Sequence, residues 1–124
     1  MACGQVKQGN PFHMEHTVTE DGDLVIVALK GEIDLEYSNQ VRKVLLDVIG
    51  DPHGIVVDMS GVSMIDSSGV ASLLEAFQTA RKRGKEFVLA CVGESVSRVL
   101  KLARLDTVFK IADDVEGAKQ AIKG

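Results

Sequence analysis

Three helix-capping residues and a glycine stand in a row at Asp66, Ser67, Ser68 and Gly69. A helix needs only one side chain at its N-cap, so this run offers hydroxyl groups beyond what capping requires. A helix start exposes unpaired backbone N–H groups and carries a partial positive charge, which together suit a bound or covalently attached phosphate. The residue types alone also fit an ordinary helix cap, and both interpretations stay open.

Two loops are predicted to hold the functional groups. Residues 31–34 follow one apolar segment, and residues 60–69 connect a second apolar segment to the start of a helix. In open α/β sheets, functional groups gather in loops beyond the carboxyl ends of strands, so both loops lie where a site is expected. Met64 and Ile65 belong to the second loop, where they either form a contact surface for a partner or tuck beneath the helix.

Enzymatic chemistry at these serines has little support in the sequence. The string from Asp66 to Val70 lacks the first glycine of the Gly-x-Ser-x-Gly nucleophile elbow, and no histidine base is well placed. No P-loop or dinucleotide fingerprint occurs. Asp58 ends an apolar segment as the phosphoacceptor of a receiver domain would, but the paired acids that would hold Mg²⁺ are missing. An enzyme that uses Ser67 as its nucleophile is therefore ranked last.

No metal or cofactor site is predicted. A metal ion needs about four ligands, and His13, His16 and His53 have no ligand-like partners nearby. Two cysteines are too few for a disulfide framework. Cys91 lies within an apolar segment and is expected to be a buried apolar side chain, whereas Cys3 falls in the N-terminal tail.

The apolar pattern predicts strands that alternate with helices. Continuous β-branched runs predict buried strands, and spacings of three and four residues predict helices with one apolar face. The predicted strands cover residues 14–19, 24–29, 55–59, 87–92 and 108–111, and the apolar faces of the predicted helices cover 41–48, 70–77, 96–103 and 115–122. The order ββαβαβαβα implies an α/β fold with right-handed crossovers and a mostly parallel central sheet that has an antiparallel edge strand.

Length and charge limit the classes of protein that fit. The chain has 124 residues, 45% of them apolar, which is enough for one core. Residues 1–12 are expected to form a flexible extension and residues 13–124 a single domain. The net charge of −4 argues against nucleic acid as a partner, and the cations at 81–83 are expected to be a solvated helix end. Short apolar runs and the lack of an apolar leader segment predict no membrane span and a cytoplasmic location.

Three segments together resemble the STAS domain family, and in particular the bacterial anti-sigma factor antagonists. The string over residues 56–69, which ends in Asp-Ser-Ser-Gly, is similar to the signature of that family. Residues 31–34, Gly-Glu-Ile-Asp, resemble its early loop motif, and residues 96–109 are similar to its later part. The resemblance covers residues 14–122 and implies the STAS fold.

The resemblance also implies a partner-switching regulator with no catalysis of its own. In that family, an anti-sigma factor that is also a serine kinase phosphorylates the first serine of Asp-Ser-Ser-Gly, which is Ser67 here. The unphosphorylated antagonist binds the kinase and frees a sigma factor, and a serine phosphatase restores the active form. The implied partner-binding residues surround this serine: Asp34, Ser63, Met64, Asp66, Ser67, Ser68 and Gly69.

One alternative keeps the same fold and changes the role. The chain would then be a scaffold subunit of a lipid-transport ATPase or of a stress-sensing complex, and Ser67 would be structural. The sequence leaves open whether Ser68 is also phosphorylated.

Overall fold

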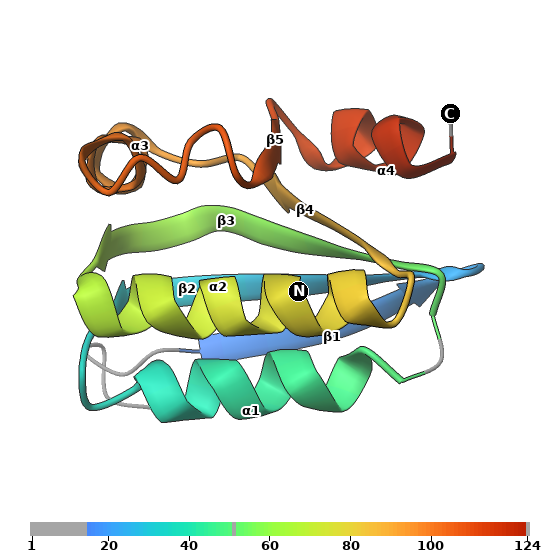
Figure 1. The fold of residues 1–124 in the computed structure, drawn as a ribbon, viewed down its shortest axis with the longest axis horizontal. Helices are drawn as coiled ribbons and strands as arrows, with labels where there is room; N and C mark the ends of the chain where they lie inside the picture. Colours follow the sequence, from blue (N-terminus) through green and yellow to red (C-terminus); the bar gives the residue numbers. More distant parts are fainter. Residues whose placement is uncertain (1–14, 51, 124) are drawn as a thin grey trace, which may run out of the picture.

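The computed structural model describes residues 15–50 and 52–123. These residues form a five-stranded sheet and four helices in the predicted order ββαβαβαβα (Figure 1). The elements are β1 (Glu15–Asp21), β2 (Leu24–Ile33), α1 (Ser38–Val48), β3 (Gly54–Ile65), α2 (Ser67–Lys82), β4 (Glu86–Ala90), α3 (Glu94–Leu102), β5 (Lys110–Ala112) and α4 (Val115–Lys123). The extension predicted over residues 1–12, with Cys3, and also His13 lie outside the described residues.

The strands lie in the sheet in chain order, β1-β2-β3-β4-β5. β1 pairs antiparallel with β2, and every other neighbouring pair is parallel. The β1–β2 hairpin turns at Gly22, whose φ of 62° is a left-handed conformation that glycine adopts without strain. The predicted fold class, a mostly parallel sheet with an antiparallel edge strand, is therefore confirmed.

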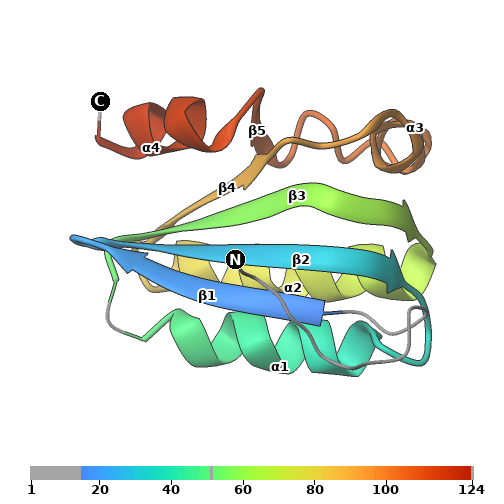
Figure 2. The same ribbon diagram turned by 180° about the vertical axis from the view of Figure 1, so that it is seen from behind.

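Helices cover both faces of the sheet (Figures 1 and 2). Buried side chains of α1, α2 and α3 join one core with alternate strand residues such as Val57 and Leu89. α4 packs on the opposite face, where Ile122 joins a smaller core with Leu24 and Val56. Because the central strands are buried on both sides, their sequences read as continuous apolar runs.

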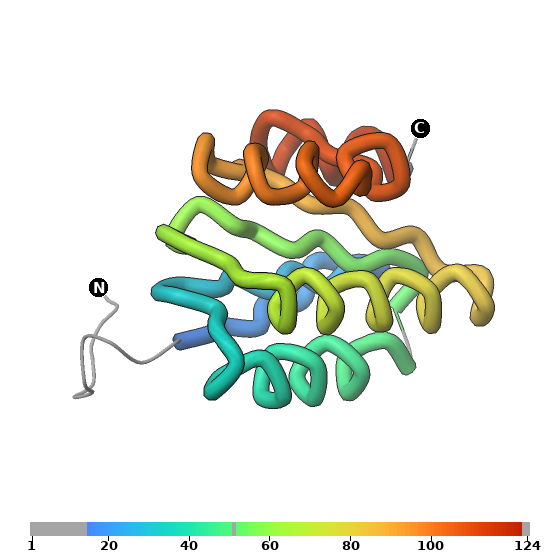
Figure 3. The backbone as a smooth tube through the Cα atoms, turned by 60° about the vertical axis from the view of Figure 1, so that its left-hand side comes forward, coloured from blue at the N-terminus to red at the C-terminus, as the bar shows by residue number. Residues whose placement is uncertain are grey.

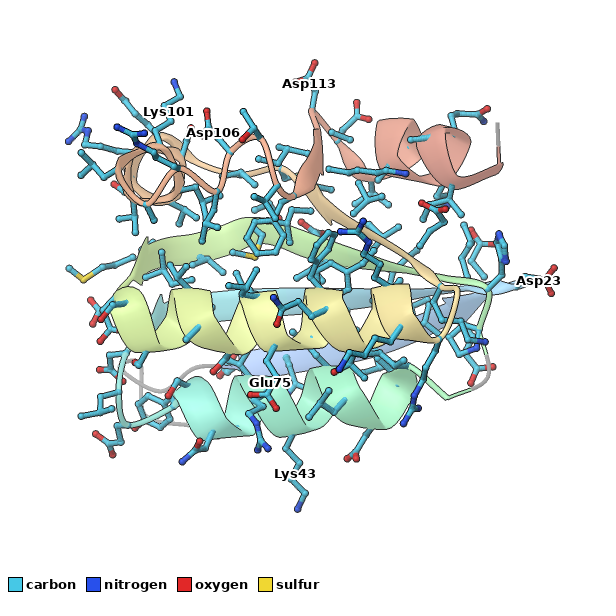
Figure 4. All side chains as sticks on the ribbon, in the orientation of Figure 1. Asp23, Lys43, Glu75, Lys101, Asp106 and Asp113 are labelled. Carbon is cyan, nitrogen blue, oxygen red and sulfur yellow. The ribbon has the colours of Figure 1, made fainter. Side chains whose placement is uncertain are left out.

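α1 and α2 lie side by side on one face of the sheet (Figures 1 and 3). Glu75 points from α2 toward α1 in Figure 4, and its carboxylate accepts a hydrogen bond from Arg42 Nε at 2.9 Å. The buried Ser72 hydroxyl of α2 donates to the Ser38 carbonyl of α1 at 2.9 Å. Both contacts advance in the same direction along the two helices, so α1 and α2 run parallel and begin at the same end of the sheet.

β2 and β3 are longer than the sequence pattern predicts. The pattern ends these strands at residues 29 and 59 and predicts loops beyond them, but β2 runs to Ile33 and β3 to Ile65. Two register shifts in their pairing break the regular alternation on which such predictions depend, and Gly31, with a φ of 108°, lies at one of them. The loop predictions are therefore wrong for most of both segments, because the chain leaves the sheet only at Asp34 and Asp66.

The prediction that Cys91 is a buried apolar side chain is only partly correct, because Cys91 packs against the smaller core but is not fully buried. β4 ends at Ala90, so Cys91 lies just beyond the strand. It is half-buried and has a left-handed φ of 59°. Burial is the largest cause that raises the pKa of its thiol, and the neighbouring Asp58 carboxylate adds to it. The last strand also begins later than predicted, since Val108 and Phe109 form a turn in which their N–H groups donate to the Leu105 carbonyl, each at 3.0 Å.

Candidate functional site

β2 and β3 end side by side, and an aspartate follows each strand at once. Ile33 pairs with Ile65 in the parallel register, so Asp34 and Asp66 leave the sheet as neighbours. The Asp66 N–H donates to the Ile33 carbonyl at 3.1 Å, which extends the contact one residue beyond the strands. β2 and β3 end where α2 begins (Figure 1), so both aspartates lie at that end of the sheet. The two segments predicted to hold functional groups therefore meet.

Asp66 is the N-cap of α2. Its Oδ1 accepts hydrogen bonds from the N–H groups of Ser68 and Gly69, both at 3.0 Å, and from the Ser68 hydroxyl at 2.6 Å. These donors, the Ser68 hydroxyl foremost, lower the pKa of the Asp66 carboxyl. The carboxylate is therefore charged at neutral pH and satisfies two free N–H groups of the helix. The interpretation of this segment as a helix cap is correct for Asp66.

The two serines differ in what their hydroxyls do. Ser68 is half-buried, and its hydroxyl donates to Asp66. Ser67, the first residue of α2, is exposed, and its hydroxyl makes no hydrogen bond within residues 15–50 and 52–123. Capping thus occupies Asp66 and Ser68 and leaves the Ser67 hydroxyl facing solvent.

Gly69 lets the first turn of α2 approach the sheet closely. A Cβ at this position would lie 2.7 Å from Ile33 Cγ2 and from Ile65 Cγ1, and 3.0 Å from the Ile33 carbonyl oxygen. Both isoleucines are buried in the close-packed core, so neither side chain has space to move away. The missing side chain of Gly69 therefore lets Ser67 lie directly over the ends of β2 and β3.

Asp34 organises the turn that leads into α1. Its Oδ1 accepts hydrogen bonds from the N–H groups of Glu36 at 3.0 Å and Tyr37 at 3.3 Å, and its carbonyl accepts from the Ser38 N–H at 2.8 Å. An aspartate that bonds the backbone two and three residues ahead is typical of such turns. These bonds hold the Asp34 carboxylate near the Asp66 cap.

Exposed apolar side chains flank the two aspartates. Met64 is 55% exposed and Leu35 75% exposed, whereas Ile65 is buried. Of the adjacent pair Met64 and Ile65, one side chain thus faces solvent and the other tucks beneath the helix, and Ser63 is exposed beside them. Leu35 is missing from the predicted partner surface, although an apolar residue in the polar turn after Asp34 is a signal that could have identified it.

The end of the sheet that carries Ser67 is acidic. Glu32, Asp34 and Glu36 come from the end of β2 and the following turn, and Asp66 caps α2. An anion attached to Ser67 would be repelled by the nearest of these carboxylates and attracted by the N-terminus of α2. The N-terminus of α2 can therefore carry a phosphoryl group without loss of the helix. The same group would make this already acidic end of the sheet much more negative.

Clusters of three or more metal-ligating side chains are absent from residues 15–50 and 52–123. In the same residues, every helix falls short of the length and apolar character of a membrane span.

Known proteins share both the sequence and the fold of this chain. The model of the STAS domain family matches residues 15–118. An anti-sigma-B factor antagonist of Listeria monocytogenes is 31% identical over 99 residues, which make up 78% of this chain and 85% of that protein.

Two solved structures show the same fold at lower identity. An anti-sigma factor antagonist from Mycobacterium paratuberculosis is 23% identical, with a TM-score of 0.84 over 94% of this chain and 100% of the other. The cell fate determinant SpoIIAA of Bacillus, solved in its phosphorylated form, is 20% identical, with a TM-score of 0.67 over 86% of this chain and 99% of the other. The family match over nearly all described residues, together with the Listeria relative, shows that this chain belongs to the STAS domain family.

Proposed function

We propose that this chain is an anti-sigma factor antagonist that works by partner switching. Its unphosphorylated form binds an anti-sigma factor serine kinase and so frees a sigma factor, and phosphorylation of Ser67 releases the kinase. The Listeria relative is named an anti-sigma-B factor antagonist, and the Bacillus neighbour was solved in a phosphorylated form. The observation that carries the proposal is the exposed Ser67 hydroxyl, unbonded within the described residues, at the first position of α2.

The exposed position of Ser67 supports its proposed role as the phosphoacceptor. A kinase must bring the acceptor hydroxyl in line with the γ-phosphate of ATP, and a hydroxyl without an internal bond is free to turn toward it. The N-terminus of α2 stabilises an attached phosphate, so the helix tolerates the modification. Ser68 is half-buried and donates to Asp66, which would have to give up that bond. We therefore propose Ser67 alone as the acceptor.

Phosphorylation would release the partner by changing charge and shape together. It adds about 1.5 to 2 negative charges at neutral pH, close to the Asp34 and Asp66 carboxylates. A partner surface that fits a neutral hydroxyl loses contact when the bulkier phosphate occupies that place. Because about 1.4 kcal/mol already lowers affinity tenfold, modest repulsion and mismatch are enough to separate the two proteins.

The partner surface divides into contacting and shaping residues. Met64, Leu35 and Ser63 are exposed and contribute contact area, while the Asp34 carboxylate contributes charge complementarity. Asp66, Ser68 and Gly69 act mainly by fixing the position of Ser67, since two of them bond each other and the third is buried.

In this cycle the chain is a substrate and a binding partner and performs no reaction itself. The kinase supplies the phosphoryl group from ATP, and a serine phosphatase removes it. Sigma factors and ATP are found in the bacterial cytoplasm, so the proposal places the chain there as well.

A phosphorylation assay tests the assigned residue. The full chain is incubated with its cognate anti-sigma factor kinase and ATP and is then analysed by peptide mass spectrometry. We expect one phosphoryl group on Ser67, none on the Ser67→Ala variant, and full modification of Ser67 in the Ser68→Ala control. Phosphate found only on another residue would overturn the assignment.

A binding assay tests the release mechanism separately. We expect Ser67→Asp to bind the kinase at least about tenfold more weakly than the native chain, because a fixed negative charge costs at least about 1.4 kcal/mol at this surface. Ser67→Asn is the neutral control of similar size and should bind nearly as well as the native chain. Equal affinities of the phosphorylated and unphosphorylated chains, measured by isothermal titration calorimetry, would contradict the mechanism.

A further inference from the structure

A groove lies near the C-terminal end of α2, whereas Ser67 is at the N-terminal end of the same helix. Its volume is about 370 Å³, and six of its lining residues are Phe77, Arg81, Lys85, Phe87, Val108 and Lys110. Its lining residues come mainly from the end of α2, the start of β4 and the segment around the start of β5. Figure 1 shows that α2 leads directly into β4 at one end of the sheet. From Ser67 to Arg81, α2 rises about 21 Å at roughly 1.5 Å per residue, so the groove is separate from the proposed phosphorylation site.

The floor of the groove is aromatic and already packed. The Phe77 ring meets those of Phe87 and Phe109 edge to face, with centroids 6.0 Å and 5.3 Å away. Phe87 and Phe109 belong to the core, whereas Phe77 is half-buried and Val108 is 42% exposed. The exposed apolar part of the groove therefore comes from Phe77 and Val108, and contacts with two buried rings hold Phe77 in place, so an apolar group can cover it without ordering new side chains.

The walls of the groove are cationic. Lys110 Nζ lies 2.7 Å from Glu86 Oε1, so this lysine is paired with the acidic residue of the lining. The side chains of Arg81 and Lys85 make no ion pair or hydrogen bond within the described residues. The groove thus keeps two uncompensated positive charges on a chain whose net charge is −4.

The cations at 81–83 are not equivalent, although the sequence predicts them together as a solvated helix end. All three are exposed, which confirms that prediction. Only Arg81 lines the groove, however, and Lys82 and Arg83 do not. Arg81 therefore differs in its surroundings from the other two cations at this end of α2.

We infer that this groove binds a small organic anion with an apolar body, such as an aryl or alkyl carboxylate or phosphate. The apolar body would cover Phe77 and Val108, and the anionic group would lie between Arg81 and Lys85. The volume falls within the range of about 300 to 1,000 Å³ that is usual for small-molecule sites. The inference does not depend on phosphorylation of Ser67, because no residue is shared between the two sites.

Nuclear magnetic resonance titration of the full chain with phenyl phosphate tests the inference. We expect saturable shifts confined to the groove residues, and binding at least about tenfold weaker for benzyl alcohol and for inorganic phosphate, since each lacks one of the two groups that the site recognises. Equal binding of inorganic phosphate and phenyl phosphate would overturn the role of the aromatic floor. A short peptide containing phenylalanine and glutamate is a further probe: if it binds while phenyl phosphate does not, the occupant is a protein segment and the inference is wrong.

Paired charge variants test the walls. The double variant Arg81→Gln with Lys85→Gln should bind phenyl phosphate at least about tenfold more weakly, because it removes both positive charges between which the anionic group would lie. The double variant Lys82→Gln with Arg83→Gln removes the same number of charges near the same end of α2 and should keep native affinity. Equal losses in both variants would show a general effect of net charge and overturn the inferred site. Circular dichroism melting confirms that each variant is folded.

Discussion

At its first turn, α2 meets an acidic surface and is capped by Asp66, whereas its last turn carries Arg81 and Lys82. Each end therefore has the charge that complements the helix dipole, but the two ends differ in how the backbone is held. Gly69 lies near the first end and Gly84 just past the last. One end is fixed by tertiary packing, and the other is fixed by the local conformation of the chain.

The two glycines show this difference directly. At Gly69, any Cβ would collide with Ile33 and Ile65, although the backbone conformation is ordinary. At Gly84, φ is +73° and a Cβ would meet nothing within 4 Å. Gly84 closes the helix through hydrogen bonds that end it locally, since its N–H donates to the Arg81 carbonyl at 3.1 Å.

The largest expected effect is that of Gly69→Ala. The added methyl group must displace buried isoleucine side chains, so we expect a loss of about 2 kcal/mol in the free energy of unfolding. The same change at Gly84 should cost only about 1 kcal/mol, because it strains one residue and leaves the core untouched. Urea denaturation of both variants measures the comparison.

Gly50→Ala is the control for these two variants. Gly50 has no left-handed φ, and a Cβ there would meet nothing within 4 Å, so its unfolding free energy should stay close to that of the native chain. If Gly69→Ala were no more destabilising than Gly50→Ala, the close approach of α2 to the sheet would be refuted.

Asp66→Ala should produce the next largest effect. It removes the cap that accepts three hydrogen bonds, and loss of an N-cap costs about 1 kcal/mol. Ser67→Ala is the adjacent control and should change stability by less than about 0.5 kcal/mol, because its hydroxyl makes no hydrogen bond within the described residues. Thermal melting of both variants distinguishes them, and equal losses would argue against the separate roles of these two residues.

The acid dependence of stability offers a third test of the first turn. The Ser68 hydroxyl and the backbone N–H groups lower the pKa of Asp66, so its carboxylate stabilises the folded chain above the unfolded pKa of about 3.9. That contribution is lost as pH falls through the lower folded value. The stability difference between the native chain and Asp66→Asn should therefore narrow in acid denaturation below about pH 4. A difference that stays constant down to about pH 2 would contradict the shift.

The smallest expected effect concerns the C-terminus of α3. This helix ends in the same hydrogen-bond pattern as α2, but the residue in the left-handed conformation is not a glycine. The Leu105 N–H donates to the Leu100 carbonyl at 2.8 Å, and the Arg104 N–H donates to the Lys101 carbonyl at 3.0 Å. Arg104 occupies the position of Gly84 with a φ of 60°. Arg104→Gly should stabilise the chain by about 0.5 kcal/mol, because relief of left-handed strain slightly exceeds the added flexibility of the unfolded chain. A lower melting temperature for this variant would refute the comparison.

Much of the fold was predictable from the sequence because it depends on local pattern. The hairpin at Gly22, the buried central strands and a helix capped by one of the residues 66–68 all follow from residue types at short spacing. The full lengths of β2 and β3 were not predictable, because their last residues pair through register shifts that hide the alternation of apolar and polar residues. The exposure of the Leu35 side chain was not predictable either, because it depends on which neighbouring residues the folded chain places around it.

The sequence by itself determined that strands alternate with helices and that a serine-rich helix start follows a buried strand, because hydrophobic periodicity and capping preferences act within a few residues. Only the tertiary structure decided which hydroxyl stays free. Ser67 and Ser68 are the same residue type at adjacent positions, and the difference between them arises from the direction of their side chains relative to Asp66 and the sheet. The first turn of α2 is held there by the close packing of Gly69 against Ile33 and Ile65, two residues of neighbouring strands that are far apart in sequence.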